Sequence, residues 1–121
     1  MKLQPDRIIG QTITGHGDGW LAMDGEKFHQ NLLIAWTGLR QEWLGNLENF
    51  YSSEYLVSLM KSHLEILLIG CGKQKAFISL EHINPFFQQN IGVESMDTAA
   101  ACRTYNILAS ENRKVAAILF V

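Results

Sequence analysis

The sequence predicts an α/β fold with three layers, in which a central mixed sheet carries helices and an additional N-terminal β-hairpin layer. Residues 7–43 are rich in glycine turns and aromatic side chains, whereas residues 52–121 alternate helical and strand patterns. Near the C-terminus, Ala99, Ala100 and Ala101 leave one side of a helix without bulky groups. Such a helix is expected to lie close against a flat surface, most simply a sheet.

The first third of the chain has the pattern of antiparallel strands. An apolar run containing Ile13 ends at the glycine-rich turn 15–19, and residues 20–23 return as the next strand. Asp24-Gly25 then predicts a two-residue hairpin turn, because both central positions need positive φ and this pair tolerates it. Residues 32–36 form a further apolar run.

The middle of the chain changes to helical spacing. Ser52 or Ser53 is placed to cap a helix whose apolar stripe continues to His63. Residues 65–70 form a continuously apolar strand, typical of the doubly buried strands of a parallel sheet. A second helix is expected from Ser79 to Asn90. Pro85 lies inside it, so we expect either a kink there or a later start.

The last thirty residues form one strand–helix–strand unit. Residues 93–96 form a short strand, and Asp97 is a suitable N-cap for a helix that runs to about Glu111. Asn112 can end this helix in the left-handed conformation. Residues 115–121 form the terminal strand. The predicted order is therefore β-rich first, followed by alternating helices and strands.

The composition predicts one domain that spans residues 1–121. The chain is 47% hydrophobic and 18% charged, with a formal net charge of −2. Its ten Lys and Arg residues are scattered, which argues against nucleic acid as a partner. The sequence shows no secretory or transit signal, and its longest apolar run is too short to cross a bilayer. We therefore predict a cytoplasmic protein without a transmembrane segment.

The turn Gly70-Cys71-Gly72-Lys73 follows the most apolar strand and has two interpretations. Its backbone N–H groups and the Lys73 charge suit a bound anion, at the sheet edge where α/β proteins bind ligands. Thr98 and Arg103 are further candidate contacts there. The alternative is a tight structural turn, because neither the dinucleotide fingerprint nor the phosphate loop is complete.

The cysteines and histidines also allow a chemical and a structural interpretation. Cys71 and Cys102 are both expected near strand ends on one side, where they can approach each other and where Lys73 or Arg103 can activate a thiolate. The simpler interpretation is two small buried side chains, since no Cys-x-x-Cys motif is present. The four histidines lack the spacing of metal ligands, so we expect neither a metal nor a cofactor.

Polar and aromatic residues supply the remaining candidates. On the C-terminal helix, Arg103 and Asn106 share one face, which suits either an acidic partner group or hydrogen bonds to neighbouring loops. Aromatic side chains can anchor a protein interface, and they are concentrated in the first half: Trp20, Trp36, Trp43, Phe50 and Tyr51. The alternative for at least two of the tryptophans is the core between the two β layers.

Two segments resemble the motifs of a known family. They are Gly70-Cys71-Gly72, and a longer C-terminal run made up of Glu94, Met96-Asp97-Thr98, Ala101-Cys102-Arg103-Thr104-Tyr105-Asn106, Glu111, Arg113 and Val115-Ala116-Ala117. The chain is similar in these residues to the Mth-type domain-of-unknown-function family, which includes a mitochondrial complex I assembly factor and an adipogenesis-associated protein. The resemblance implies a three-layer α/β fold, with protein-assembly work in mitochondria and an unassigned role in bacteria. It assigns no catalytic residue, and Cys71 departs from the threonine that the family often has.

Two functions are consistent with these features. The first is a non-catalytic module that binds a protein partner, by resemblance a respiratory-complex assembly-type factor, with Trp20, Trp36 and Trp43 as contacts. The second is a small-anion or nucleotide site, or a thiol-dependent enzyme, that uses Gly70, Cys71, Gly72, Lys73, Thr98, Cys102 and Arg103. The sequence favours the first and leaves open whether the chain forms a homo-oligomer.

Overall fold

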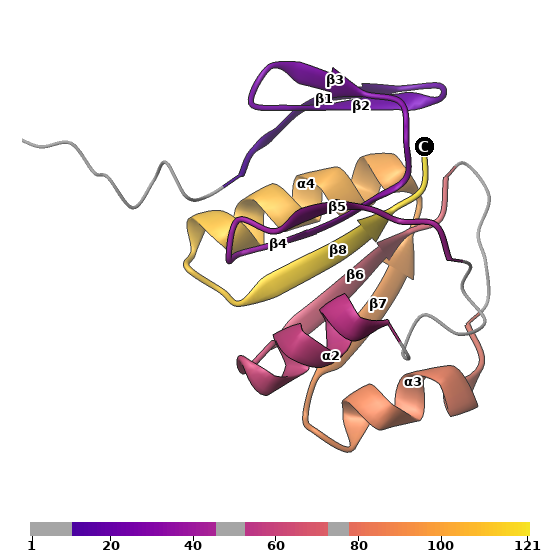
Figure 1. The fold of residues 1–121 in the computed structure, drawn as a ribbon, viewed down its shortest axis with the longest axis vertical. Helices are drawn as coiled ribbons and strands as arrows, with labels where there is room; N and C mark the ends of the chain where they lie inside the picture. The colour runs from indigo at the N-terminus through magenta and orange to yellow at the C-terminus, as the bar shows by residue number, and fades with distance from the viewer. Residues whose placement is uncertain (1–10, 46–52, 73–77) are drawn as a thin grey trace, which may run out of the picture.

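The computed structural model describes residues 11–45, 53–72 and 78–121. It shows a small hairpin sheet, a larger mixed sheet and helices on both faces of the larger sheet (Figure 1). The elements are, in chain order, β1 (Ile13–Gly17), β2 (Trp20–Met23), β3 (Glu26–Phe28), β4 (Leu32–Ala35), β5 (Arg40–Glu42), α2 (Glu54–Lys61), β6 (Ile66–Gly70), α3 (Leu80–Phe87), β7 (Gly92–Met96), α4 (Thr98–Ser110) and β8 (Val115–Leu119).

The larger sheet is mixed, as predicted. Its strand order is β5-β4-β8-β6-β7, with β6 parallel to both β7 and β8 and with β4 antiparallel to β5 and β8. All five residues of β8 are buried, and four of the five in β6 are buried too. Continuous apolar runs suit these central strands because both of their faces are covered.

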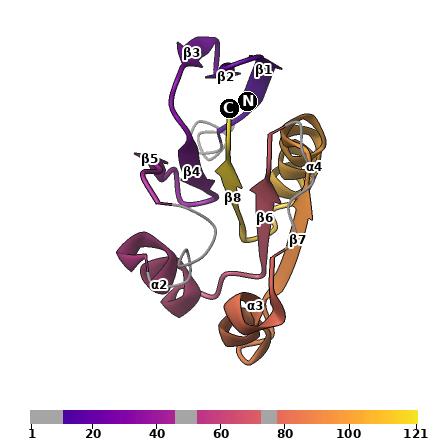
Figure 2. The same ribbon diagram turned by 90° about the vertical axis from the view of Figure 1, so that its right-hand side faces the viewer.

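Two cores lie on opposite faces of this sheet. Helices α2 and α3 cover one face, and α4 covers the other together with the hairpin sheet (Figure 2). Alternate residues of a strand point to opposite faces. Accordingly, Leu67 and Ile69 belong to the α2–α3 core, whereas Leu68 belongs to the α4 core. This arrangement confirms the predicted fold class with its additional β-hairpin layer.

The hairpin sheet has the order β1-β2-β3, and both neighbouring pairs are antiparallel. At the second turn Asp24 has φ 51° and Gly25 has φ 87°, which confirms the two-residue turn predicted from this pair. The turn is closed by the Thr12 N–H, which donates to Asp24 Oδ1, and by the Gly25 N–H, which donates to Thr14 Oγ1.

All three helices of the described residues end at a non-glycine residue in the left-handed conformation: His63, Asn90 and Asn112. In each case the next N–H bonds back to a carbonyl five residues earlier, for example from Arg113 to Leu108 at 3.0 Å. The predicted stop at Asn112 is confirmed. His63 corrects a prediction, because it is exposed and ends α2 where we expected it to extend the apolar stripe.

Helix α3 begins directly after Ser79 and contains Pro85, so the later start that Pro85 suggested is wrong. Ser79 is its N-cap, and the helix runs from Leu80 through Pro85 to Phe87, shorter than predicted. Proline removes the hydrogen bond to the carbonyl of Glu81, four residues earlier. Glu81 lies in an exposed first turn, where water can replace the missing donor. The proline is tolerated there for that reason.

Helix α4 lies close over β6 and β8, as its alanines predict. Asp97 caps it, with Oδ1 accepting from the Ala100 N–H at 2.7 Å, and Ala101 is fully buried. A Cβ atom placed on Gly70 would lie 3.1 Å from atoms of Ala101, Thr98 and Leu119. The small residues on both sides therefore set the spacing between helix and sheet.

Candidate functional site

A cleft of about 850 Å³ opens at the carboxyl ends of the parallel strands β6 and β7. Ligands of open α/β sheets bind at this edge. Four segments form its wall: the β1–β2 turn, the residues after β6, the first turn of α4 and the residues after β8. The lining residues are His16, Gly17, Asp18, Gly19, Cys71, Gly72, Asp97, Thr98, Ala99, Phe120 and Val121.

Thr98 holds the floor of the cleft together. Its hydroxyl donates to the Phe120 carbonyl at 2.6 Å and accepts from the Gly72 N–H at 2.8 Å. The Thr98 N–H donates to the Gly72 carbonyl at 3.0 Å. The hydroxyl donor and the Gly72 amide are thus used in joining β6, β8 and α4. Gly72 has φ 78°, a conformation that favours glycine.

The charges that line the cleft do not favour an anion. Asp97 occupies the N-terminus of α4, where an anion would otherwise be stabilised, and Asp18 adds a second carboxylate. Among the described residues, the lining contains neither Lys nor Arg. The amides of Thr98, Ala100 and Ala101 are already bonded within the protein. The first turn of α4 therefore offers little to a phosphate.

The structure brings part of the predicted ligand site together. Cys71, Gly72 and Thr98 line the cleft. Gly70 lies behind it, packed against α4. Arg103 is exposed on α4 and is not part of the lining. The fourth residue of the turn, Lys73, lies outside the described residues.

The two cysteines lie in different cores, so the interpretation in which they approach each other is wrong. Cys71 is half-buried and packs against the α2–α3 core, whereas Cys102 belongs to the α4 core on the other face of the sheet. The two thiols form no disulfide. Burial raises the pKa of Cys102 to about 11, with the nearby Arg103 charge opposing the rise and Asp97 adding to it. At neutral pH the Cys102 thiol is protonated, which is unfavourable for a nucleophile.

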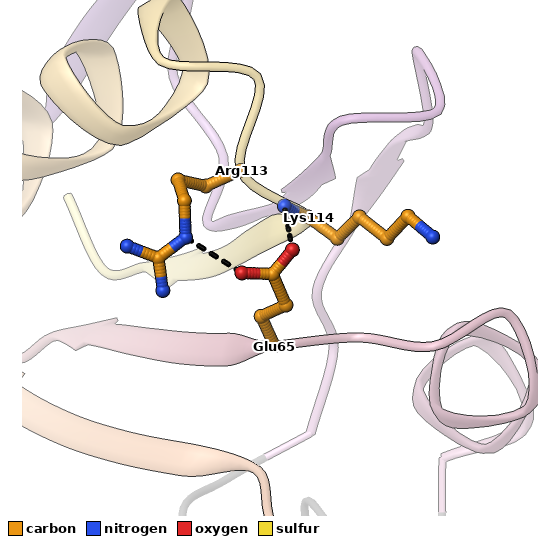
Figure 3. A network of polar contacts seen from close by, with 3 residues as sticks. All are labelled: Glu65, Arg113 and Lys114. Atoms are coloured by element: carbon orange, nitrogen blue, oxygen red, sulfur yellow. Dashed lines mark hydrogen bonds and ion pairs between the residues drawn. The ribbon is translucent and has the colours of Figure 1, made fainter.

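The polar residues of α4 and its flanks are structural in this geometry. Asn106 Oδ1 accepts from the Ile13 N–H at 2.9 Å, and its Nδ2 donates to the Ile13 carbonyl at 2.8 Å, so α4 holds strand β1. Figure 3 shows the opposite end of β6, where Arg113 Nε lies 2.6 Å from Glu65 Oε1 and the Lys114 N–H donates to Glu65 Oε2. This pair joins the starts of β6 and β8, far from the cleft.

Two buried side-chain groups have no hydrogen-bond partner among the described residues, Trp43 Nε1 and the Tyr105 hydroxyl. Burial also raises the pKa of Tyr105, and the Asp24 charge adds to the rise. Neither residue lines the cleft. The described residues contain no grouping of His, Cys, Asp and Glu suited to a metal ion.

The three tryptophans lie in different places. Trp43 is 7% exposed and belongs to the α2–α3 core, and the half-buried Trp36 packs against the same core. Both therefore lie on the face of the main sheet that α2 and α3 cover, which corrects the expected position between the two β layers. Trp20 lies on the hairpin sheet, where the Lys27 Nζ atom stands 4.3 Å from the centroid of its ring. Phe50 and Tyr51 lie outside the described residues.

Sequence reasoning missed the part of the cleft that comes from the hairpin. His16 and Asp18 stand in the β1–β2 turn, more than fifty residues before Cys71 in the chain. Their contribution depends on how the hairpin sheet docks onto α4, and no local pattern reports that docking.

The comparison with known families agrees with this fold. A family described as "Protein of unknown function (DUF498/DUF598)" matches residues 13–120. The chain belongs to this family. The predicted resemblance to Mth-type domains is thereby confirmed, because solved structures of this fold include a Bordetella pertussis protein described as a Mth938-like domain.

Relatives of this DUF498/DUF598 member carry two kinds of name. A Francisella tularensis protein named "13 kDa major membrane protein" is 33% identical over 96 residues, which cover 78% of this chain and 77% of that protein. A Danio rerio protein named "NADH dehydrogenase [ubiquinone] 1 alpha subcomplex assembly factor 3" is 36% identical over 53% of this chain and 37% of its own length. The chain thus spans little more than a third of that assembly factor.

Solved structures share the fold over most of the chain. A Bordetella parapertussis protein is 31% identical with a TM-score of 0.76, covering 91% of this chain and 94% of its own. The Bordetella pertussis Mth938-like domain is 27% identical with a TM-score of 0.71, covering 99% and 92%. In the part of this DUF498/DUF598 member that the structure describes, no helix is both long enough and apolar enough to cross a bilayer.

Proposed function

We propose that this chain is a non-catalytic protein-binding module of the assembly-factor type. The observation that supports it is a set of exposed apolar side chains on the two helices that cover one face of the sheet. They are Tyr55 and Val57 on α2, and Leu80 and Phe87 on α3, exposed by 44, 38, 68 and 47%. Leu80 and Phe87 are seven residues apart and so lie on one side of α3. Leu80 and Phe87 therefore expose two large apolar groups on the same side of α3, and exposed apolar and aromatic groups are typical of protein interfaces.

The relatives support the same class of function. The curated proteins similar to this chain include assembly factors for NADH dehydrogenase from Danio rerio, Xenopus tropicalis and Homo sapiens. Because this chain corresponds to about a third of each of them, it represents their shared domain and not their whole activity. We infer that holding a partner protein is the role of this domain, with a respiratory-complex subunit or assembly intermediate as the partner.

A capture experiment at native expression tests this proposal. The full chain is crosslinked in its own cell and compared with a Leu80→Ser and Phe87→Ser double variant. Leu44→Ser serves as the matched control, because Leu44 is 86% exposed and follows β5 at the opposite edge of the sheet. We expect a specific partner that the control retains and the double variant loses. Capture of no specific partner by the unmodified chain would refute the proposal.

A small-ligand site is the second candidate, and the cleft beside Cys71, Gly72 and Thr98 is the observation that favours it. The carboxylates of Asp18 and Asp97 and the buried, protonated Cys102 count against an anion, a nucleotide or a thiolate mechanism. Thermal-shift measurements with inorganic phosphate and nucleotides separate the two candidates. A ligand that binds the folded state raises the melting temperature by mass action, whereas an unchanged temperature removes this candidate. The cytoplasmic location and a homo-oligomer stay predictions.

A further inference from the structure

Strand β7 forms an edge of the main sheet with unpaired backbone groups. Among the residues that the structure describes, it pairs only with β6 and is the outermost strand on its side (Figures 1 and 2). The Gly92 N–H donates to Glu65 and the Met96 carbonyl accepts from Cys71, so these two residues face β6. Successive residues of a parallel strand direct their backbone groups to alternate sides. Val93 and Ser95 therefore point their N–H and C=O groups toward the open edge.

The opposite edge is protected in a way that β7 is not. Strand β5 has three residues, and its exposed Arg40 and Glu42 carry charges. Short length, charge, lysine and proline are the usual protections of an edge strand. Strand β7 is longer, contains neither lysine nor proline, and carries a single charge at Glu94. Its backbone is thus left available as a template for a further strand.

Helix α4 provides an apolar flank beside this edge. The Thr104 hydroxyl contacts Met96 Sδ at 3.6 Å, so this side of α4 lies toward β7. Ile107 follows Thr104 by three residues and shares that side of the helix, where it is 57% exposed. Glu94 lies two residues before Met96 and so projects from the same face of the sheet as α4. A side chain on this face of an added strand would lie beside Glu94, on the same side of the sheet as Ile107.

The charge of Glu94 indicates what kind of strand fits. Glu94 is exposed and has no ion-pair partner among the described residues. A second copy of this chain is disfavoured, because the antiparallel register that pairs all five residues places Glu94 opposite its own copy. Like charges directly opposite each other destabilise a sheet, whereas a cation there stabilises it.

We propose that β7 binds an extended segment of a partner protein, which adds a sixth strand to the five-stranded sheet and places a Lys or Arg beside Glu94. Main-chain hydrogen bonds to Val93 and Ser95 supply the pairing. An apolar side chain of the segment covers Ile107. This inference rests on the protein-binding function proposed above and specifies the chemistry of the partner.

A random-peptide phage library selected on the immobilised full chain tests the proposal, followed by affinity measurements with synthetic copies of the selected peptides. Ser95→Pro removes one outward N–H at a position where an edge strand tolerates proline. Ser95→Ala is the matched control, since it changes the side chain and keeps the amide. We expect basic peptides whose binding Ser95→Pro weakens by at least about tenfold, whereas Ser95→Ala leaves it unchanged. Glu94→Lys should also weaken binding, increasingly so at low salt.

Amide hydrogen exchange provides the direct readout. On peptide binding, the Val93 and Ser95 amides should become protected, while amides of β5 keep their exchange rates. Selection of no basic peptide, or peptides that bind Ser95→Pro as well as the unmodified chain, would overturn the proposal. A cellular partner captured equally by the unmodified chain and by Ser95→Pro would overturn this inference and leave the protein-binding function standing. A dimer of the chain disrupted by Ser95→Pro would replace the partner segment with a second copy.

Discussion

At Gly70 the sheet and α4 approach so closely that a methyl group has no room. The three atoms that would meet it at 3.1 Å include the Thr98 Cα, which is backbone and cannot rotate away. Thr98 also supplies the hydroxyl that joins Gly72 to Phe120. Both glycines of the Gly-Cys-Gly motif therefore have a structural reason. Gly70 is required by the close packing against α4, and Gly72 has φ 78°, a conformation that favours glycine.

Replacing Gly70 with alanine should lower the free energy of unfolding by about 1–3 kcal/mol, because the added methyl group overpacks the interface between β6 and α4. Gly92→Ala is the control, since a Cβ there would meet its nearest atom at an ordinary 3.7 Å. Chemical denaturation of both variants measures the difference. Equal stability of the two variants would show that α4 can move away from the sheet at no cost.

Cys102 gives the stability of the protein a pH dependence. Burial raises the pKa of the Cys102 thiol from 9.0, the value of an unperturbed thiol, to about 11, so the folded state holds the thiol proton more tightly. The corresponding stabilisation is complete below about pH 9 and is lost as the pH rises through 11. We expect Cys102→Ala to flatten the decline in unfolding free energy over this window. An unchanged slope would place the Cys102 thiol in contact with water.

The same burial predicts slow chemistry at Cys102. Only the thiolate reacts with iodoacetamide, and the Cys102 side chain is buried and protonated at neutral pH. Alkylation of Cys102 should therefore wait for unfolding, whereas the half-buried Cys71 should react first. Mass spectrometry of partially alkylated protein identifies the order. Rapid alkylation of Cys102 in the folded protein would contradict this prediction and would support the hypothesis of a thiol-dependent enzyme.

Among the elements, α4 connects the two sheets. Its Ala101 side packs on the main sheet, and Asn106 on its flank bonds to both backbone groups of Ile13 in β1. The amide side chain thus takes the place of a neighbouring strand at the start of the hairpin layer. No other standard side chain except glutamine has an amide donor and acceptor together, and glutamine is longer.

Asn106→Ala should remove both partly buried hydrogen bonds and lower the free energy of unfolding by about 1–3 kcal/mol, since each bond contributes about 1 kcal/mol and the Ile13 groups are left unpaired. Asn106→Asp keeps the acceptor and loses the donor, so its loss should be smaller than that of Asn106→Ala. Denaturation curves with hydrogen exchange of β1 report both effects. Unaltered β1 exchange in Asn106→Ala would show that apolar packing alone holds the hairpin.

Local chemistry made several elements predictable. Asp97, Asn112 and the Asp24-Gly25 pair act through their own backbone conformations, so their roles follow from sequence. How Pro85 and His63 fit into their helices cannot be predicted in this way. Whether a missing hydrogen bond can be replaced by water, and whether a histidine faces the core, depends on exposure in the folded protein.

For the molecule as a whole, stability is expected to be uneven. Strands β6 and β8 lie between two cores, whereas β3 is mostly exposed at the edge of the hairpin sheet. Amides of β6 and β8 should exchange only through global unfolding, and those of β3 through local opening at lower free energy. Native-state hydrogen exchange under increasing denaturant distinguishes the two classes. Identical exchange free energies would mean that the hairpin layer unfolds together with the main sheet.

By itself the sequence determined the class of fold, the order of most strands and helices, the turn at Asp24-Gly25 and the close packing of α4 on the sheet. These features follow from periodicity, capping residues and small side chains, which act over a few neighbouring positions. Only the tertiary structure decided which residues far apart in the sequence lie close together in space. It put Cys71 and Cys102 in different cores, brought His16 and Asp18 to the cleft beside Thr98, and left β7 at an open edge. Strand order and layer docking depend on contacts between residues far apart in the chain, and these contacts leave no local pattern.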